Sequence, residues 1–297
     1  MPTSKTVVVA GATGRLGEIV DALIERGHRV RALTRDPGSN AAARLLELGA
    51  EVHYGDFDEP HGVARAATGA DAMFATGTAH RVGPDGELRH GIAIADAAAA
   101  AGVGQLVYVS GEGAAADSPL PLMRTKFAVE RHIASLPTGY TILAPVYYME
   151  NLFNPWNLPS LTSRVLPSPV PIDLPIQQVA VAEVVALAVA AIEQPKEFDR
   201  KRVAVASDEL TAVDAAAAIT AAIGIEMEPK RLDTSMLPPG LRALFAWLET
   251  DAPSVDLDQL HGNHPEVRWS SYADWAESQR ARFRALCPHP HAEAVAH

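Results

Sequence analysis

Two spacings of apolar residues alternate along the first half of the chain. Short β-branched runs such as residues 6–10 are followed by segments in which apolar side chains recur every three or four positions, as at Leu16, Ile19 and Leu23. The first spacing is typical of buried strands and the second of amphipathic helices. Strands are expected at residues 6–10, 29–33, 51–54, 72–76, 106–110 and 140–144, and further helices at 41–48, 62–67, 87–101 and from about 121 to 136. This alternation predicts an α/β fold, a doubly wound parallel sheet of the Rossmann type with helices on both faces.

The alternation ends after Pro145, where prolines become frequent. Helices are expected again at residues 181–192, 213–223 and around the apolar stripe of Leu241, Leu244, Phe245 and Leu248, with one strand at 202–206. The change predicts a Rossmann core of residues 1–154 and 176–207 and a smaller lobe of residues 155–175 and 208–286 on the substrate side. Residues 287–297 are expected to be a disordered tail.

A glycine-rich segment joins the first strand to the first helix. It reads Gly11, Ala12, Thr13, Gly14, Arg15, Leu16, Gly17. Glycines at this spacing permit a tight turn, let the backbone approach a pyrophosphate and let the helix pack close to the strand. The free N–H groups and the positive end of the helix dipole then face the phosphates. Because the segment stands between a strand and a helix, it predicts a dinucleotide-binding loop rather than a ligand-free turn.

The residues after the second strand indicate which dinucleotide is bound. NAD-binding proteins usually place Asp or Glu there to bond the ribose 2′-hydroxyl. Here Arg35 precedes Asp36, and a guanidinium is suited to a 2′-phosphate. Arg15 would close on the same phosphate from within the loop. The predicted cofactor is therefore NADP(H), with an ordinary surface charge as the alternative for each arginine.

Charge and composition exclude several other functions. A net charge of −11 and a pI near 5.4 disfavour nucleic acid as a partner. A single cysteine, Cys287, allows no internal disulfide, and the histidines lack the spacing of a zinc motif, so no metal site is expected. Neither a signal peptide nor an apolar segment of membrane-spanning length is found, which predicts a cytoplasmic protein without membrane contact.

Several further segments, in order along the chain, carry one family pattern. They are LTRDP at residues 33–37, YGDF at 54–57, the alanine-rich helix leading to YVS at 95–110, residues 126–132, APVYYMEN at 144–151, and HP at 264–265 followed by YADW at 272–275. Together with the glycine loop, these segments resemble the NmrA-like branch of the atypical short-chain dehydrogenase/reductases over most of the chain.

The resemblance implies contacts at the adenine half of the cofactor. Asp56 and Phe57 would flank the adenine, and Thr76 and Gly77 would pass the ribose and the pyrophosphate. From the residues alone, Asp56 is better explained as a turn cap and Phe57 as a packing residue.

The resemblance also implies contacts at the nicotinamide half. Ser110 would lie beside the nicotinamide, and Lys126 would bond the hydroxyls of the nicotinamide ribose. The loop formed by Pro145, Val146, Tyr147 and Tyr148 would touch the carboxamide. The alternative for Lys126 is an ordinary ion pair on the helix surface with Glu130, four residues later.

Leu122 departs from the pattern of short-chain dehydrogenases that reduce carbonyls. Those enzymes commonly carry a proton-donating tyrosine at this place, four residues before the lysine. Lys126 is then the main catalytic candidate, and Tyr147 or His80 are alternative proton donors. Loop packing is the alternative for Tyr147, and a solvated loop position for His80.

Three functions remain open for a protein of this pattern. The favoured one is an NADPH-dependent reductase of a small organic acceptor such as a quinone, a dye, an enone or a benzylic ether. The second is a regulator that senses NADP(H) without turnover, supported by Ala144 at a position where relatives often have arginine. The third is an isomerase, epimerase or lyase. A small-molecule substrate is expected in the first and third cases, and a homodimer or a protein partner stays open.

Overall fold

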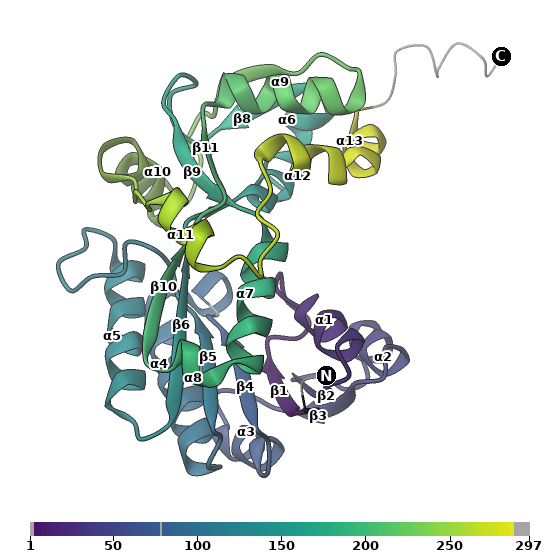
Figure 1. Cartoon of the computed structure of the whole chain (residues 1–297). Coiled ribbons are helices and arrows are strands. Elements are labelled where there is room, and N and C mark those ends of the chain that lie inside the picture. The colour runs from purple at the N-terminus through teal and green to yellow at the C-terminus, as the bar shows by residue number, and fades with distance from the viewer. Residues whose placement is uncertain (1–2, 78, 288–297) are drawn as a thin grey trace. The chain divides into compact units, whose positions relative to one another are not determined.

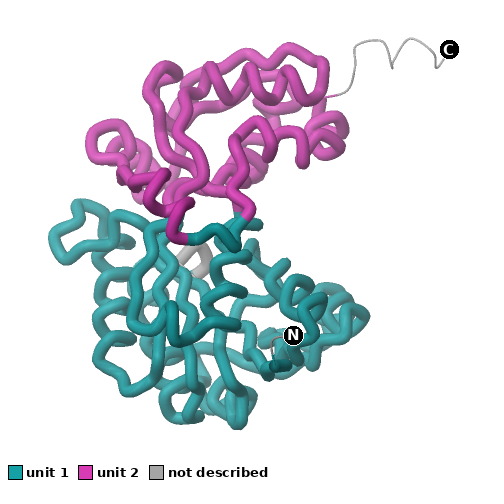
Figure 2. The backbone as a smooth tube through the Cα atoms, in the orientation of Figure 1, with its two compact units in different colours: residues 1–145, 181–205, 264–267 teal, residues 146–180, 206–263, 268–297 magenta. Residues whose placement is uncertain are grey.

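The computed structural model describes residues 3–77 and 79–287, apart from the side chains of residues 79–81. The chain divides into two compact units (Figure 2). Unit 1 comprises residues 1–145, 181–205 and 264–267, and unit 2 comprises residues 146–180, 206–263 and 268–297.

A seven-stranded parallel sheet forms the centre of unit 1 (Figure 1). Its strands are β1 (Thr6–Ala10), β2 (Arg29–Thr34), β3 (Glu51–Tyr54), β4 (Ala72–Thr76), β5 (Gln105–Val109), β6 (Gly139–Pro145) and β10 (Lys201–Val205), in the order β10-β6-β5-β4-β1-β2-β3. The strand order reverses beside β1, which pairs with β2 on one side and with β4 on the other. Open sheets of this kind bind ligands at such a reversal, beyond the carboxyl ends of the strands. The predicted Rossmann fold is confirmed.

Helices cover both faces of this sheet. They are α1 (Ile19–Glu25), α2 (Asn40–Glu47), α3 (Pro60–Ala67), α4 (Ala79–Ala100), α5 (Pro121–Ser135), α7 (Val181–Glu193) and the short α8 (Pro195–Phe198). α3, α4 and α5 pack side by side in one layer, and α1 packs against α7 in the other. Alternate strand residues such as Val8 and Met73 point into the first layer, where they meet Ile94 and Val129. The parallel strands are therefore buried on both faces, as their nearly continuous apolar sequences predict.

The helix expected at residues 87–101 begins earlier than the apolar pattern indicates. α4 starts at Ala79 and is interrupted at Gly83, whose φ of 69° and ψ of −176° lie outside the helical region. Pro84 follows, and since proline cannot donate the helical hydrogen bond, it begins a new helical segment. Because of this kink, the apolar pattern in the sequence predicts only the second part of α4.

Unit 2 is built from short elements. It contains η1 (Met149–Phe153), α6 (Leu158–Thr162), α9 (Ala212–Ile223), α10 (Pro239–Asp251), α11 (Leu257–Asn263), α12 (Tyr272–Ser278) and α13 (Arg280–Leu286). Two small sheets accompany them: β7 (Tyr147–Tyr148), β9 (Ile176–Val179) and β11 (Asp208–Leu210) form one, and β8 (Val165–Ser168) and β12 (Glu228–Arg231) form the other. Ile219, Phe283 and Trp275 lie together in its core. The sequence did not predict these sheets, because their strands have only two to four residues and lie outside the regular alternation of strands and helices.

The pairing of β7 explains where the first unit boundary falls. Tyr147 and Tyr148 lie parallel to Gln178 and Val179 of β9, so the chain enters unit 2 directly after Pro145. We predicted this boundary at residue 154 from the sequence, because the regular alternation of strand and helix patterns fades gradually there. Residues 264–267 return to unit 1, which the sequence pattern did not indicate.

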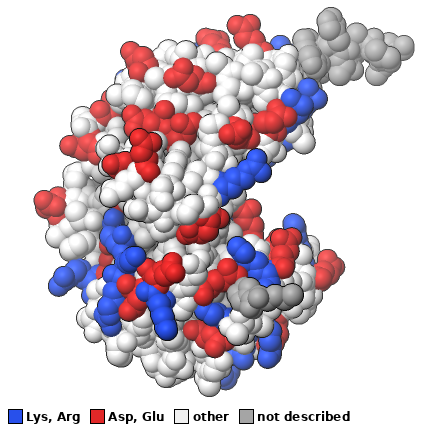
Figure 3. All heavy atoms as spheres, viewed as in Figure 1, with Lys and Arg blue, Asp and Glu red and all other residues white. Residues whose placement is uncertain are grey.

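The distribution of charge follows the acidic composition. On the face drawn in Figure 3, acidic side chains are spread over both units, whereas most basic ones lie over unit 1. Among the described residues, no helix has both the length and the apolar character needed to cross a bilayer.

Thr211 offers a direct test of how unit 2 is held together. Its hydroxyl accepts from the backbone N–H of Asp214, whose carboxylate accepts from the Thr211 N–H in return, so the two cap the start of α9. We expect Thr211→Ala to lower the free energy of unfolding by about 1 kcal/mol, measured by urea denaturation. Val213→Ala, an exposed change in the same first turn, is the control and should stay within about 0.5 kcal/mol of the wild type. Equal effects of the two changes would contradict the capping role.

Candidate functional site

The glycine loop lies at the carboxyl end of β1. Gly11 has a φ of 99°, and a Cβ there would come 2.7 Å from Cγ2 of Thr76 at the end of β4. A Cβ on Gly17 would lie 2.3 Å from the carbonyl oxygen of Ala12. Both positions therefore exclude a side chain, the first through backbone conformation and close packing and the second through close packing alone.

The loop turns tightly before α1 begins. The N–H of Gly14 donates to the oxygen of Gly11 at 2.9 Å, and the N–H of Gly17 donates to the oxygen of Gly14 at 3.0 Å. Ala12 and Leu16 are buried, whereas Thr13, Gly14 and Arg15 are exposed. The loop thus has the form that the sequence predicts, with its middle residues open to solvent at the reversal of strand order.

Arg35 lies at the edge of the sheet beside this loop. The register of β1 and β2 places Ala10 opposite Leu33, so the residues that follow each strand emerge next to each other. Within the described part of the chain, the exposed Arg35 side chain makes no hydrogen bond or ion pair. The Asp36 carboxylate accepts from the backbone N–H of Gly38 at 3.0 Å and so stabilises the turn. Arg35 is therefore available for an anion, while Asp36 has a structural partner.

Two residues with expected adenine contacts have local structural roles. The Asp56 carboxylate accepts from the backbone N–H of Asp58 at 3.0 Å, and the Phe57 ring meets His90 edge-on with 5.6 Å between ring centres. These contacts match the turn cap and the packing residue that the residues alone suggest. Flanking of the adenine stays a prediction for both.

A buried charged cluster lies beyond β5. The Ser110 hydroxyl donates to Oε1 of Glu130 at 2.5 Å, and Nε of Arg202 donates to Oε2 of the same carboxylate at 3.0 Å. Arg202 also pairs with Glu112 at 2.6 Å. Burial would lower the pKa of the Arg202 guanidinium, but the two carboxylates outweigh this effect and raise it. Since the Ser110 proton is used by Glu130, the lone pairs of its oxygen are what it can offer a ligand.

Lys126 makes a different ion pair from the one that helix spacing suggests. Its Nζ lies 2.9 Å from Oε1 of Glu87 on α4, whereas Glu130 bonds Ser110 and Arg202. The alternative of a surface pair with Glu130 is therefore wrong. Leu122, one helical turn earlier on α5, is half-buried and supplies no proton donor.

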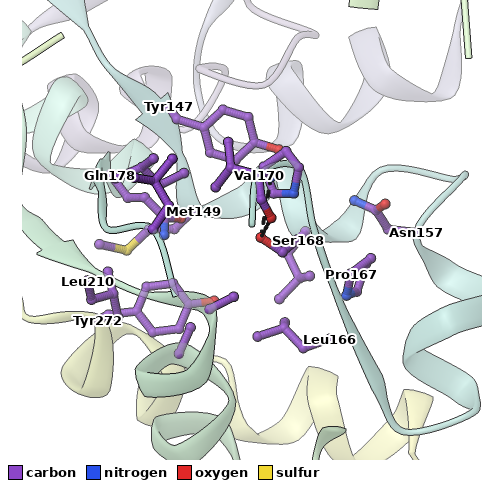
Figure 4. Close-up of a pocket in the computed structure, with 16 residues that line it drawn as sticks. Tyr147, Met149, Asn157, Leu166, Pro167, Ser168, Val170, Gln178, Leu210 and Tyr272 are labelled. Carbon is purple, nitrogen blue, oxygen red and sulfur yellow. Dashed lines mark hydrogen bonds between the residues drawn. The ribbon is translucent and has the colours of Figure 1, made fainter. Parts of the chain in front are cut away.

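Tyr147 lines a pocket inside unit 2 (Figure 4). The figure shows Tyr147 and Tyr272 on opposite sides of it, with the Tyr272 hydroxyl directed toward its middle. The sixteen lining residues are Tyr147, Met149, Leu152, Asn157, Leu166, Pro167, Ser168, Pro169, Val170, Leu174, Ile176, Gln178, Leu210, Ala212, Ala215 and Tyr272. None of these sixteen side chains is charged. The volume of about 40 Å³ gives room for about three water molecules, so the pocket accepts a small group.

Buried polar atoms give this pocket its chemistry. Burial raises the pKa of the Tyr272 hydroxyl far above its ordinary value, and Tyr147 and Glu150 add to the effect. The hydroxyl therefore keeps its proton. Nδ2 of Asn157 donates to the oxygen of Asn151 at 3.0 Å, but its Oδ1 is buried without a hydrogen-bond partner among the described residues. An unpaired buried oxygen is costly, and this oxygen is one of four such side-chain atoms among the described residues.

Some site residues were missed by sequence reasoning, and one prediction cannot be placed. Glu87, Glu130 and Arg202 come from α4, α5 and β10, and only the folded sheet brings them to one edge. The one signal for Glu87 was its place three residues after Pro84, in the first turn of a new helical segment. The His80 side chain lies outside the described residues.

A family comparison agrees with this geometry. The model of the NmrA-like family matches residues 3–277. The chain belongs to the NmrA-like family. A NAD(P)H azoreductase of Xenophilus azovorans is 27% identical over 297 residues, covering 94% of the chain and 99% of the relative. A photosystem II assembly factor, Ycf39 of Cyanophora paradoxa, is 30% identical but covers 54% of the chain, and the match spans about half (51%) of that protein.

Solved structures of low sequence identity share the fold of this NmrA-like chain. NmrA, a negative transcriptional regulator solved with NADP, is 20% identical with a TM-score of 0.76, covering 94% of this chain and 96% of that one. The triphenylmethane reductase of a Citrobacter species, solved with NADP(H), is 21% identical with a TM-score of 0.75, covering 93% and 99%.

Arg202 offers a test of the buried cluster. We expect Arg202→Met to lower the free energy of unfolding by about 3 kcal/mol, since it leaves the Glu130 carboxylate buried with the Ser110 hydroxyl alone. Lys201→Met, a change of the exposed neighbour on the same strand, should have an effect below about 0.5 kcal/mol in the same urea titration. The double variant Arg202→Met with Glu130→Gln should recover part of the loss. A single variant as stable as the control would show that Glu130 does not depend on Arg202.

Proposed function

We propose that this NmrA-like protein is an NADPH-dependent reductase of a small, neutral organic acceptor. The observation that carries the proposal is the glycine loop at the reversal of strand order, with the unpaired Arg35 guanidinium at the neighbouring strand end. The azoreductase relative, which covers nearly the whole chain, supports a reductase.

The residues around the loop fit a dinucleotide. The exposed residues 13–15 of the loop would face the pyrophosphate, and Arg35 would bind the 2′-phosphate, aided by Arg15. Lys126 would donate to the nicotinamide ribose hydroxyls, and the Ser110 oxygen would accept a hydrogen bond from the cofactor. When bound, NADPH supplies a hydride.

We propose that the pocket of unit 2 receives the reducible end of the acceptor, since its volume of about 40 Å³ admits only a small group. Its lining carries no charge, so a sulfonate or a quaternary ammonium group there would lose its hydration without compensation. The protonated hydroxyl of Tyr272 would donate to a carbonyl or azo group, and Tyr147 comes two residues after the end of β6. Reduction of a quinone needs one hydride and one proton, and water can supply the proton where residue 122 is leucine.

Replacement of Arg35 tests the preference for NADPH. We expect Arg35→Ala to raise the Kd for NADPH at least tenfold and to change the Kd for NADH less than twofold, since only NADPH carries the 2′-phosphate. Arg44→Ala, which removes another exposed arginine from α2, is the matched control. Both dissociation constants can be measured by calorimetry. An unchanged preference for NADPH would overturn the assignment of Arg35.

An acceptor panel tests the reaction itself. We expect 1,4-naphthoquinone, a neutral quinone, to stimulate NADPH oxidation at 340 nm, with a kcat/KM at least tenfold above that of its charged derivative 1,4-naphthoquinone-2-sulfonate. A neutral azo dye and its sulfonated form provide a second matched pair. Absence of stimulation by all four compounds would contradict the reductase, and equal rates within both pairs would contradict the uncharged pocket as the acceptor site.

A regulator that senses NADP(H) is the second candidate. Leu122 in place of a tyrosine and Ala144 before Pro145 favour it, and the structural neighbour NmrA is described as a negative transcriptional regulator. A redox sensor must bind NADPH and NADP⁺ with different affinities. Different affinities together with no turnover of the panel would favour the regulator over the reductase.

A further inference from the structure

The ion pair of Glu87 and Lys126 is one of the most deeply buried in unit 1. The Glu87 side chain has no exposed surface and that of Lys126 retains 12%. A buried carboxylate is costly unless a cation and hydrogen bonds compensate it, so the two side chains fix each other's positions. The pair joins α4 to α5, two helices of the same layer.

Local sequence places Glu87 at this point. The kink at Gly83 and Pro84 starts a new helical segment, and Glu87 falls in its first turn. Backbone N–H groups are unpaired there and the helix dipole favours a negative charge. The sequence around the kink therefore turns a carboxylate toward the sheet edge rather than toward solvent.

Glu87 also determines what can follow β4. A Cβ on Gly77 would lie 2.0 Å from Oε1 of Glu87, so the carboxylate occupies the space of a side chain at residue 77. The stem of Lys126 runs close to Gly111, with Cδ 3.3 Å from the place of a Cβ there. The ion pair thus lies across the carboxyl ends of β4 and β5, of which β4 is next to β1 at the reversal of strand order.

We propose that Glu87 is a positioning residue for the nicotinamide half of the cofactor. It takes one N–H of the Lys126 ammonium and leaves two donors for the ribose hydroxyls. Glu130 does not take this place, since its two oxygens bond Ser110 and Arg202 and the ammonium bonds Glu87. In a chain with leucine at residue 122, the lysine is thereby held by a carboxylate on a neighbouring helix. This inference rests on the proposed binding of NADP(H).

The test compares two ligands that share the adenine half. Adenosine 2′,5′-bisphosphate contains the 2′-phosphate and the adenosine of NADPH but lacks the nicotinamide ribose. We expect Glu87→Gln to raise the Kd for NADPH about tenfold while the Kd for adenosine 2′,5′-bisphosphate changes less than twofold, both by calorimetry. Asp85→Asn removes an exposed carboxylate two residues earlier and should change neither constant.

A second variant reaches the same pair without altering its charges. Glu87→Asp keeps the carboxylate but withdraws it from Lys126 by one methylene group, so it should loosen the pair and give the same selective loss of NADPH affinity. This variant decides the matter if Glu87→Gln fails to fold, as judged by circular dichroism.

The outcomes separate this inference from the function on which it rests. Equal weakening of both ligands by a folded variant would show a general structural role, and no weakening of either would show that Glu87 does not position the lysine. Each result overturns the inference and leaves the reductase proposal intact. A wild-type protein that does not bind NADPH would overturn the proposed function itself.

Discussion

Pairing of buried charge is the constraint on which the edge of the sheet depends. Two carboxylates from α4 and α5 lie almost without solvent contact, and each needs a cation. Glu87 forms an ion pair with Lys126, and Glu130 forms one with Arg202 of β10. The first pair joins α4 to α5, and the second joins α5 to β10. Ion pairs as well as apolar packing therefore hold the residues of the site in place.

The same pairing limits the chemistry that the site can perform. The Ser110 hydroxyl donates its proton to Glu130, and the Leu122 side chain has no proton to donate. Neither residue can therefore replace the proton-donating tyrosine of dehydrogenases that reduce carbonyls. Lys126 carries a charge balanced by Glu87, which suits it to orienting a ribose. Acceptors whose reduced forms take a proton from water are compatible with such a site.

Sequence reasoning succeeded where one local pattern has one structural meaning. The parallel sheet and the glycine loop follow from spacing alone, and the strands 51–54 and 72–76 begin and end at the predicted residues. The partners of Lys126 and Ser110 could not be predicted, because the contact of Glu87 with Lys126 joins residues 39 positions apart on two helices. The short strands of unit 2 were not predicted for another reason. β7, for example, is recognised only by its pairing with β9.

Membership of the NmrA-like family does not by itself distinguish an enzyme from a sensor, because a fold hosts many functions. The distinction must come from residues outside the shared dinucleotide loop. In this chain the protonated hydroxyl of Tyr272 faces a pocket whose lining carries no charge, a combination that suits a small neutral group. A sensor of the cofactor alone has no need of such a pocket. Its presence in unit 2 therefore weighs toward a reductase.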